Sequence, residues 1–271
     1  MPESSLSGPL FSILSSLVEE RTGMHYDVHD GEIFGSKLAA RAREAGFESP
    51  LDYYYYLRYD DPGGREFDAL TEALVVNETY FFREGDRLRA LCDEVVRPQL
   101  AARPRVRVWC AASSTGEEPM TLAMLLAERG VLDRVEIVAS DISPRALARA
   151  KEGVFGARSL RALPDDARRW FDPAGDRVIV RPEVRDPILW RRVNLIDASA
   201  VADLGVFDAI LCRNVLIYFS EKTVRRVVGT LSNALGQDGR LLVGASESLL
   251  RFGTLLVCEE RGGTFFYGRG R

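Results

Sequence analysis

The hydrophobic pattern of this chain changes its period near residue 105, and that change constrains the fold more than any other feature. Before it, apolar residues recur every three or four positions, as in Leu10–Glu20. After it, Val106–Ala111 is a short apolar run typical of a buried strand. A small-residue turn over 112–116, a helical pattern over Glu117–Arg129 and a second apolar run, Val135–Ala139, then follow. This order predicts a strand–helix–strand unit of an open parallel sheet.

The residues before this change predict a small all-helical domain over 1–76. Its helices are expected at Leu10–Glu20, Ser36–Ala45, from Ser49-Pro50 onward and at Phe67–Val75. Residues 77–104 are expected to form a linker and a first helix over Arg87–Leu100. Residues 105–271 then form the sheet domain.

Later strands are expected at Phe207–Cys212 and Arg240–Gly244, with a helix from Ser220 to Leu235 between them. The C-terminal runs Leu255–Cys258 and Thr264–Tyr267 predict an antiparallel pair. We expect residues 145–172 to be helical. Short strands at Arg177–Arg181 and Ile188–Val193 would form a small β subdomain at about 173–193.

Asp141 follows the second strand, and Ser143-Pro144 after it is a typical helix start. An acid at this edge of an open sheet is where the ribose of an adenosine-bearing cofactor is held. The turn 112–116 lacks the GxGxxG pattern, which disfavours NAD. Glu117 and Glu118 would repel a pyrophosphate but suit a cationic ligand such as S-adenosylmethionine. Alternatively, both acids simply stabilise the start of their helix.

Polar and aromatic residues mix between Asn77 and Arg83, which suits either a ligand site or a linker with an aromatic plug. His25 and His29 lie four apart, but the turn residues around them disfavour a metal, and we expect none. The four cysteines show no CxxC spacing, so we expect buried free thiols in a reducing cytosol.

Composition excludes several classes of protein. The formal net charge of -4 does not favour nucleic-acid binding. No apolar stretch approaches the roughly 20 residues that span a bilayer, and no basic segment precedes a signal-like run. We expect a soluble, cytoplasmic, monomeric protein that does not insert into membranes.

Five stretches together resemble the chemotaxis-receptor methyltransferases, the CheR family. They read NETYFFRE (77–84), WCAASSTGEEP (109–119), ASDIS (139–143), FDAILCRNVLIYF (207–219) and GASES (244–248). The resemblance implies a Rossmann-like S-adenosylmethionine-dependent methyltransferase domain, of the α/β class, with an N-terminal all-helical domain and a small β subdomain.

The resemblance also implies chemistry. S-adenosylmethionine would be the methyl donor, S-adenosylhomocysteine the product, and a glutamate side chain of a chemoreceptor the acceptor. Positions carried over as cofactor contacts are Asn77, Thr79, Arg83, Glu117, Asp141, Asn194, Leu195, Arg213 and Asn214. Tyr218 matches a tyrosine near the transferred methyl group, so Arg83 and Tyr218 are the catalytic candidates.

The predicted helix 36–45 carries Lys37, Arg41 and Arg43, which form either a solvated face or a docking surface for an acidic receptor helix. Some family members also bind a C-terminal receptor pentapeptide on the β subdomain. The segment Phe171–Arg181 is short for that, so we expect no such tether here. Two rival functions are methylation of another substrate and a non-catalytic sensor of the cofactor.

Overall fold

The computed structural model describes residues 6–270, and the chain divides into two compact units. The helical unit comprises the residues up to Val76 together with Tyr218–Ser220. The sheet unit comprises Asn77–Ile217 and the residues from Glu221 onward. Each unit is described here by itself.

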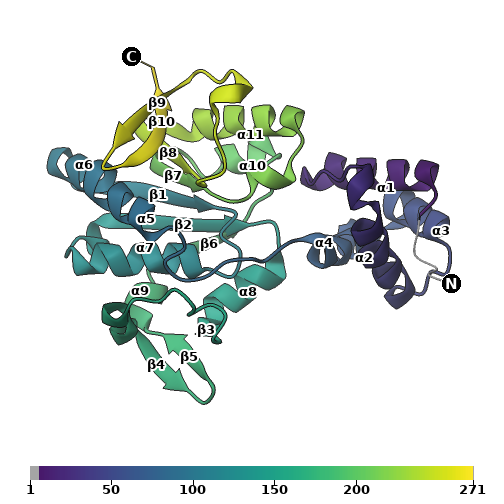
Figure 1. Ribbon diagram of the computed structural model, residues 1–271, viewed down its shortest axis with the longest axis horizontal. Coiled ribbons are helices and arrows are strands. Elements are labelled where there is room, and N and C mark those ends of the chain that lie inside the picture. Colours follow the sequence, from purple (N-terminus) through teal and green to yellow (C-terminus); the bar gives the residue numbers. More distant parts are fainter. Residues whose placement is uncertain (1–5, 271) are drawn as a thin grey trace. The chain divides into compact units, whose positions relative to one another are not determined.

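The described part of the helical unit, from residue 6 onward, contains four α-helices: α1 (Gly8–Thr22), α2 (Gly31–Glu44), α3 (Pro50–Tyr55) and α4 (Arg65–Leu74). Gly23 ends α1 in the left-handed region at φ 82°, and Ser49 caps α3 by accepting the Asp52 N–H at 3.3 Å. Helix α2 begins five residues before its predicted start, because a 3₁₀ turn with an Asp27 capping box leads directly into it. The predicted four-helix composition is confirmed (Figure 1).

The sheet unit is built on seven strands in the order β6-β2-β1-β7-β8-β10-β9. The strands are β1 (Val106–Ala111), β2 (Val135–Asp141), β6 (Ile188–Arg192), β7 (Phe207–Cys212), β8 (Leu235–Val243), β9 (Leu256–Arg261) and β10 (Thr264–Arg269). The first five in the order are parallel, whereas β10 runs antiparallel to both of its neighbours. The predicted limits of β1 and β7 and the C-terminal antiparallel pair are confirmed.

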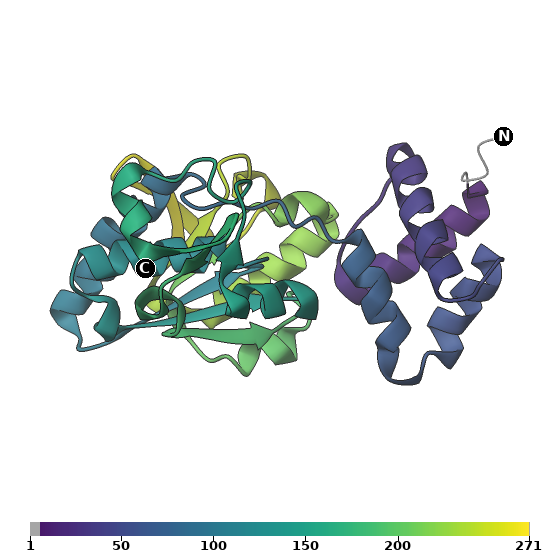
Figure 2. The same ribbon diagram turned by 90° about the horizontal axis from the view of Figure 1, so that it is seen from below.

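Helices flank this sheet on both faces (Figures 1 and 2). They are α5 (Gly85–Leu91), α6 (Arg97–Ala102), α7 (Glu117–Glu128), α8 (Pro144–Glu152), α9 (Pro182–Arg185), α10 (Ala198–Ala202) and α11 (Glu221–Ala234). The chain leaves β1 through α7 toward β2, but leaves β7 through α11 in the opposite direction. Since such crossovers are right-handed, α7 and α11 cover opposite faces.

The expected helix over 145–172 is wrong. Helix α8 ends at Glu152 because Gly153 adopts a left-handed conformation, φ 69°, that caps it. The chain continues into β3 (Val154–Phe155), a 3₁₀ turn over 165–170, β4 (Phe171–Ala174) and β5 (Arg177–Val180). These three strands form a separate small sheet in the order β3-β5-β4.

The expected limits of the small β subdomain, 173–193, also need correction. Strand β6 pairs with β2 in the large sheet, from Ile137↔Ile188 to Asp141↔Arg192. The small sheet therefore uses residues between 154 and 180. Period alone missed this, because a two-residue strand such as β3 has no period to detect.

The topology creates one switch point, at the carboxyl ends of β1 and its two neighbours. Ala111 pairs with Ser140 of β2 on one side and with Cys212 of β7 on the other. The loops that follow these three strands therefore meet at one edge of the sheet, where open α/β folds bind ligands.

Candidate active site

Asp141 ends β2 at this edge, and its carboxylate is held by the backbone. Oδ2 accepts the Ser114 N–H at 2.8 Å, and Oδ1 accepts the Ser143 N–H at 2.9 Å. The Ser114 hydroxyl donates in turn to Oδ1 of Asn77 at 2.9 Å. The turn after β1, the end of β2 and the start of the linker are thus joined by hydrogen bonds, which bring Asp141 and Asn77 close together. Their contacts with a cofactor stay a prediction.

The turn after β1 is tightly constrained. Ala112 and Ser114 have φ values of 56° and 49°, and Gly116 has 94°. A Cβ on Gly116 would lie 2.8 Å from both the Ala150 Cβ and the Trp190 ring. Only glycine therefore fits at the start of α7.

One hydroxyl in this turn points to a ligand. Ser113 is buried, and its Oγ has no hydrogen-bond partner among residues 6–270. Buried hydroxyls normally find a partner, so a bound ligand or water is expected to supply one.

Glu117 and Glu118 begin α7 but have different surroundings. The Glu117 carboxylate, 2% exposed, accepts the Thr115 hydroxyl at 2.6 Å and the Ser159 hydroxyl at 2.8 Å. Glu118 is bound to Nη1 of Arg213 at 2.5 Å. The expectation that both acids face a cationic ligand is therefore wrong for Glu118, whose charge is offset within the protein.

Arg213 follows β7 and holds this edge together. Its side chain is 1% exposed and pairs with Glu118 and, at 3.0 Å, with Glu84. Nη2 also donates to the backbone oxygen of Arg83 at 2.9 Å. Burial raises the pKa of Glu118 although Arg213 opposes the change. Arg213 therefore fastens the linker to the end of β7, and a direct cofactor contact for it stays a prediction.

Glu247 is a structural residue of the site that sequence reasoning missed. Its carboxylate, 7% exposed, accepts four backbone N–H groups: Asn214 at 2.6 Å, Gly244 at 2.7 Å, Leu216 at 2.8 Å and Ile217 at 3.4 Å. It thereby shapes the loop after β7, in which Asn214 has a φ of 57°. The available signal was its place, since it lies four residues after Val243, the last residue of the parallel strand β8.

The remaining candidates of the sheet unit lie on the linker and after β6. Arg83 donates from Nη1 to the backbone oxygen of Glu78 at 2.7 Å, and Thr79 lies between them, half-buried. The Val193 N–H donates to the backbone oxygen of Asp141 at 3.1 Å, which brings Asn194 and the buried Leu195 to the same edge. The structure thus brings the predicted cofactor residues of five segments to one side of the sheet.

Comparison with known proteins identifies the family. Residues 77–260 match the family described as "CheR methyltransferase, SAM binding domain", and residues 9–75 match "CheR methyltransferase, all-alpha domain". The chain is 34% identical over 256 residues to Chemotaxis protein methyltransferase 2 of Vibrio cholerae, covering 92% of this chain and 88% of that one. It is 33% identical to Chemotaxis protein methyltransferase of Escherichia coli K12, covering 90% and 86%.

This chain belongs to the CheR methyltransferase family. The predicted family, the Rossmann-like fold with its helical domain and the cofactor S-adenosylmethionine are thereby confirmed. Solved structures that resemble it include magnesium protoporphyrin IX methyltransferase from Synechocystis with bound S-adenosylmethionine. That match has a TM-score of 0.38 and 12% identity and covers 85% of this chain and 94% of the other, too slight a likeness to say more.

The residues of this CheR protein fit S-adenosylmethionine. Asp141 and Glu117 place carboxylate oxygens at the edge that receives a ribose and a cationic sulfonium or ammonium group. The Ser113 hydroxyl lacks a partner among the described residues, as a ligand contact would.

Tyr218, the second catalytic candidate, is grouped with the helical unit of this CheR protein. Its backbone oxygen accepts the His25 N–H at 2.8 Å, and the adjacent Phe219 forms an isolated β-bridge with Met24. Its part in methyl transfer therefore stays a prediction.

The three predicted docking residues on α2 differ in their exposure and in the contacts that they already make within the protein. Arg41 makes a two-pronged ion pair with Glu66, at 2.7 and 2.6 Å, and is largely buried by it. Lys37 donates to the backbone oxygen of Leu74 at 3.2 Å. Arg43 is exposed, so it is the member of the three best placed to meet a partner.

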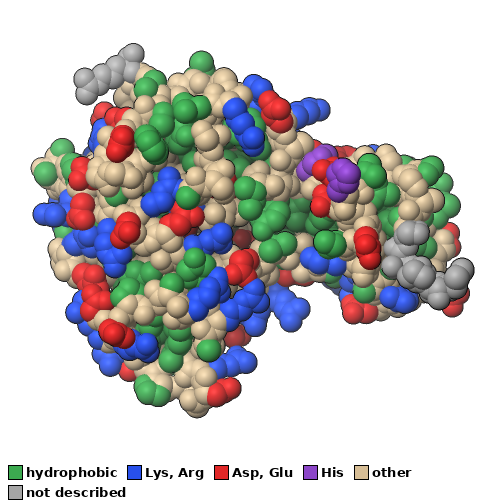
Figure 3. Space-filling model, in the orientation of Figure 1, with side chains coloured by type: hydrophobic (Ala, Val, Ile, Leu, Met, Phe, Trp, Pro, Cys, Tyr) green, Lys and Arg blue, Asp and Glu red, His purple; other side chains and the backbone are tan. Residues whose placement is uncertain are grey.

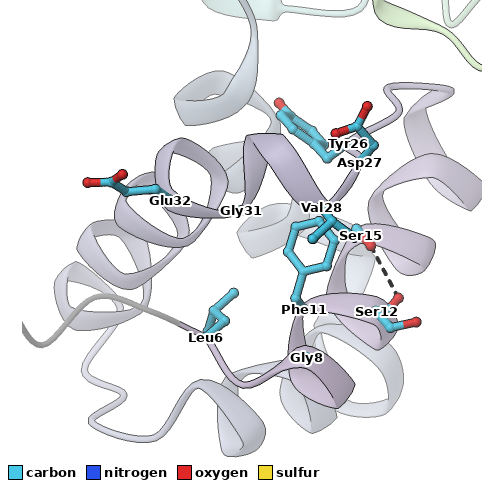
Figure 4. A pocket seen from close by; sticks show the side chains of 10 residues that line it. All are labelled: Leu6, Gly8, Phe11, Ser12, Ser15, Tyr26, Asp27, Val28, Gly31 and Glu32. Carbon is cyan, nitrogen blue, oxygen red and sulfur yellow. Dashed lines mark hydrogen bonds between the residues drawn. The ribbon is translucent and has the colours of Figure 1, made fainter.

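The helical unit also contains a groove of about 680 Å³, lined by Leu6, Gly8, Phe11, Ser12, Ser15, Tyr26, Asp27, Val28, Gly31 and Glu32 (Figure 4). None of the predicted cofactor residues lines it. Among residues 6–270, no three His, Cys, Asp or Glu side chains are arranged to hold a metal ion. No helix in the same range is long and apolar enough to cross a membrane.

Proposed function

We propose that this protein transfers the methyl group of S-adenosylmethionine to glutamate carboxylates in the cytoplasmic domain of a chemoreceptor, which forms glutamyl methyl esters. The observation that carries the proposal is the match to chemotaxis methyltransferases across both domains, at about a third identity over nine-tenths of the chain. A cofactor domain alone would be shared with methyltransferases of many substrates. The helical domain also matches the CheR family, and this second match favours chemoreceptor substrates over those of other methyltransferases.

The chemistry needs little from acid–base groups. S-adenosylmethionine supplies an activated methyl group on a positively charged sulfur, and a glutamate carboxylate is already ionised near pH 7. A general base is therefore unnecessary, in keeping with a chain whose two histidines both lie in the helical unit. The protein's contribution is then to align the two reactants and to exclude water from the carboxylate.

The site residues are placed so that they could align the cofactor and the acceptor carboxylate. Asp141, fixed by two backbone N–H groups, would hold the ribose hydroxyls. Asn77, Thr79 and Arg83 on the linker would contact the amino-acid part of the cofactor. Arg83 anchors the cofactor or steers the acceptor carboxylate, and Tyr218 orients the acceptor.

The receptor helix would dock on the exposed side of α2, through Arg43 and the neighbouring Lys37, because methylated receptor helices are acidic by the nature of their acceptor residues. Over the sheet unit, positive and negative side chains are mixed on the face seen in Figure 3. Together with the formal net charge of -4, this mixture does not favour nucleic-acid binding. We expect the cytoplasm to be the site of action and no pentapeptide tether to bind, which titration calorimetry with such a peptide would check.

The direct test is incubation of the protein with S-adenosylmethionine labelled in its methyl group. Receptor cytoplasmic domain, RNA and small carboxylic acids are offered in parallel, and the labelled receptor is mapped by peptide mass. Label on receptor glutamates, lost on mild base treatment as esters are, is the expected result. Label on RNA or a small acid would establish a different substrate, and cofactor binding without transfer to any acceptor would establish a sensor.

A further inference from the structure

A segment between two strands of the small sheet, β3 and β4, reaches the start of α7. It comprises residues 156–161, directly after β3. Within it, the Ser159 hydroxyl donates to Oε1 of Glu117 at 2.8 Å. The Ser159 backbone oxygen accepts the Phe81 N–H of the linker at 2.9 Å. One residue thus touches both the acid at the helix start and the linker that carries cofactor candidates.

The surroundings of Glu117 are unusual for a buried acid. With 2% of its surface exposed, it makes no ion pair with any Lys or Arg of the described chain. Its oxygens instead accept one hydroxyl each, from Thr115 and Ser159. A carboxylate has about four acceptor positions, so both oxygens retain capacity for a ligand. These acceptor positions suit a bound ammonium or sulfonium group, which carries a positive charge.

Ser159 is itself held firmly. Arg158 and Arg161 both pair with Glu78 of the linker, and the Arg161 guanidinium lies 3.7 Å from the centre of the Tyr80 ring. In addition, Phe81 makes edge-to-face contacts with Phe155 and Phe171 of the small sheet, at 4.8 and 4.9 Å between ring centres. The hydroxyl is therefore presented to Glu117 from a fixed backbone.

We propose that Ser159 is a positioning residue that, with Thr115, sets the orientation in which the Glu117 carboxylate meets S-adenosylmethionine. This inference rests on the proposed cofactor contact of Glu117. The segment after β3 is not one of the loops at the carboxyl ends of the strands. The proposal nevertheless gives this segment an indirect part in cofactor binding. Without the Ser159 hydroxyl, the Glu117 carboxylate loses one of its two hydrogen-bond donors, the one at Oε1, and turns away from its binding orientation for part of the time.

The test is a double-mutant cycle read by titration calorimetry with S-adenosylhomocysteine. The variants are Ser159→Ala, Glu117→Ala and the two combined. We expect Ser159→Ala to weaken binding about tenfold, as the loss of a hydrogen bond to a charged group implies. In the Glu117→Ala background the same change should alter affinity less than twofold, because no carboxylate remains to be oriented.

Two controls separate positioning from general damage. Ser159→Thr keeps the hydroxyl and should restore binding to within twofold of the wild type. Ser36→Ala removes an exposed serine of α2, outside the sheet unit, and should leave binding unchanged. Wild-type affinity in Ser159→Ala, or an equal loss in both Glu117 backgrounds, would overturn the proposal. The titration needs no receptor, so a failure to methylate receptor glutamates would refute the proposed function and leave this inference standing.

Discussion

Oε2 of Glu247 accepts the backbone N–H of Asn214 at 2.6 Å, and this bond joins the ends of β7 and β8. Gly244 permits the approach, since a Cβ there would lie 2.6 Å from the same oxygen and 2.8 Å from Nδ2 of Asn214. The loop that leads from Arg213 to Tyr218 thus takes its shape from a carboxylate 33 residues further along the chain. Glutamate is required because its two oxygens only accept, whereas an amide must also donate.

Replacement of Glu247 by glutamine tests this arrangement. In Glu247→Gln, the new NH₂ group faces backbone N–H groups, so at least one buried donor loses its acceptor. We expect the sheet unit to lose about 1–3 kcal/mol of unfolding free energy and methyl transfer to fall at least tenfold. Urea unfolding and the initial rate measure the two effects. The matched control, Glu260→Gln at an exposed position of β9, should change neither, and equal behaviour of both variants would refute the role.

Gly116 and Gly130 both have positive φ values, but only Gly116 is closely surrounded by other side chains. Their alanine variants therefore separate the effect of backbone strain from that of a steric clash. Gly116→Ala meets both, since φ is 94° and the Ala150 and Trp190 side chains lie 2.8 Å from the added carbon. Gly130→Ala has φ 66° and nothing within 4 Å. We expect Gly130→Ala to cost about 1–2 kcal/mol and Gly116→Ala clearly more, with loss of S-adenosylhomocysteine binding only in the latter. Similar unfolding midpoints for the two variants would contradict the packing described at the turn after β1.

Arg213 compensates the buried charge of Glu118, and its removal should make stability depend on pH. Burial raises the pKa of Glu118, and the loss of Arg213 would raise it further. A carboxyl group with a raised pKa in the folded state binds its proton more readily there than in the unfolded chain. Stability therefore falls as pH rises from about 4.3, the unfolded value, through the folded pKa.

We accordingly expect Arg213→Met to be destabilised by about 3–5 kcal/mol at pH 8 and by clearly less at pH 5. Glu84 adds to the same trend. Burial raises the pKa of Glu84, but Arg213 and Arg87 together hold it below its usual value. The ionised Glu84 therefore stabilises the folded state above about pH 4.5, and part of this stabilisation is lost in the absence of Arg213. Urea unfolding at both pH values gives the answer. The double variant Arg213→Met with Glu118→Gln should show a smaller difference, and a deficit independent of pH would exclude the mechanism.

Receptor docking through α2 is testable at one exposed charge. Arg43→Glu should slow methylation of receptor domain severalfold, through a weaker encounter with an acidic helix, while S-adenosylhomocysteine affinity stays unchanged. The effect should shrink at high salt. Arg65→Glu reverses an equally exposed charge at the start of α4 and serves as the matched control. Equal rates for the two variants would show that α2 does not face the receptor.

The sequence predicted those parts of the fold that have a strong period. Strands β1 and β7 were bounded correctly because both are buried apolar runs that end in small or polar residues. Cys92, Cys110 and Cys212 are buried as expected, and burial raises the pKa of Cys92 to about 12. The expectation is wrong for Cys258, which is only partly buried on β9. Strand β5 lies where a strand was predicted, at Arg177–Arg181. Strands β3 and β4 were missed because such short strands are defined by the strands with which they pair.

The sequence predicted only part of the candidate site, because only some of its residues can be recognised from their local surroundings in the sequence. Asp141 was found from its place after a strand, which is local information. Glu247, Ser159 and the ion pairs of Arg213 depend on contacts between segments 33 to 130 residues apart, which no local pattern encodes. Arg41 was assigned to a docking surface because its ion pair with Glu66, which lies on another helix, cannot be detected from a local pattern either.

The central claim is that Asp141, at the carboxyl edge of β2, holds the sugar of S-adenosylmethionine. A crystal structure of the protein with S-adenosylhomocysteine measures this most directly. We predict both ribose hydroxyls within hydrogen-bond distance, about 2.6–3.2 Å, of the Asp141 carboxylate, with the amino-acid end toward Asn77 and Arg83. A product molecule bound elsewhere, with the edge beside Asp141 empty, would contradict the account.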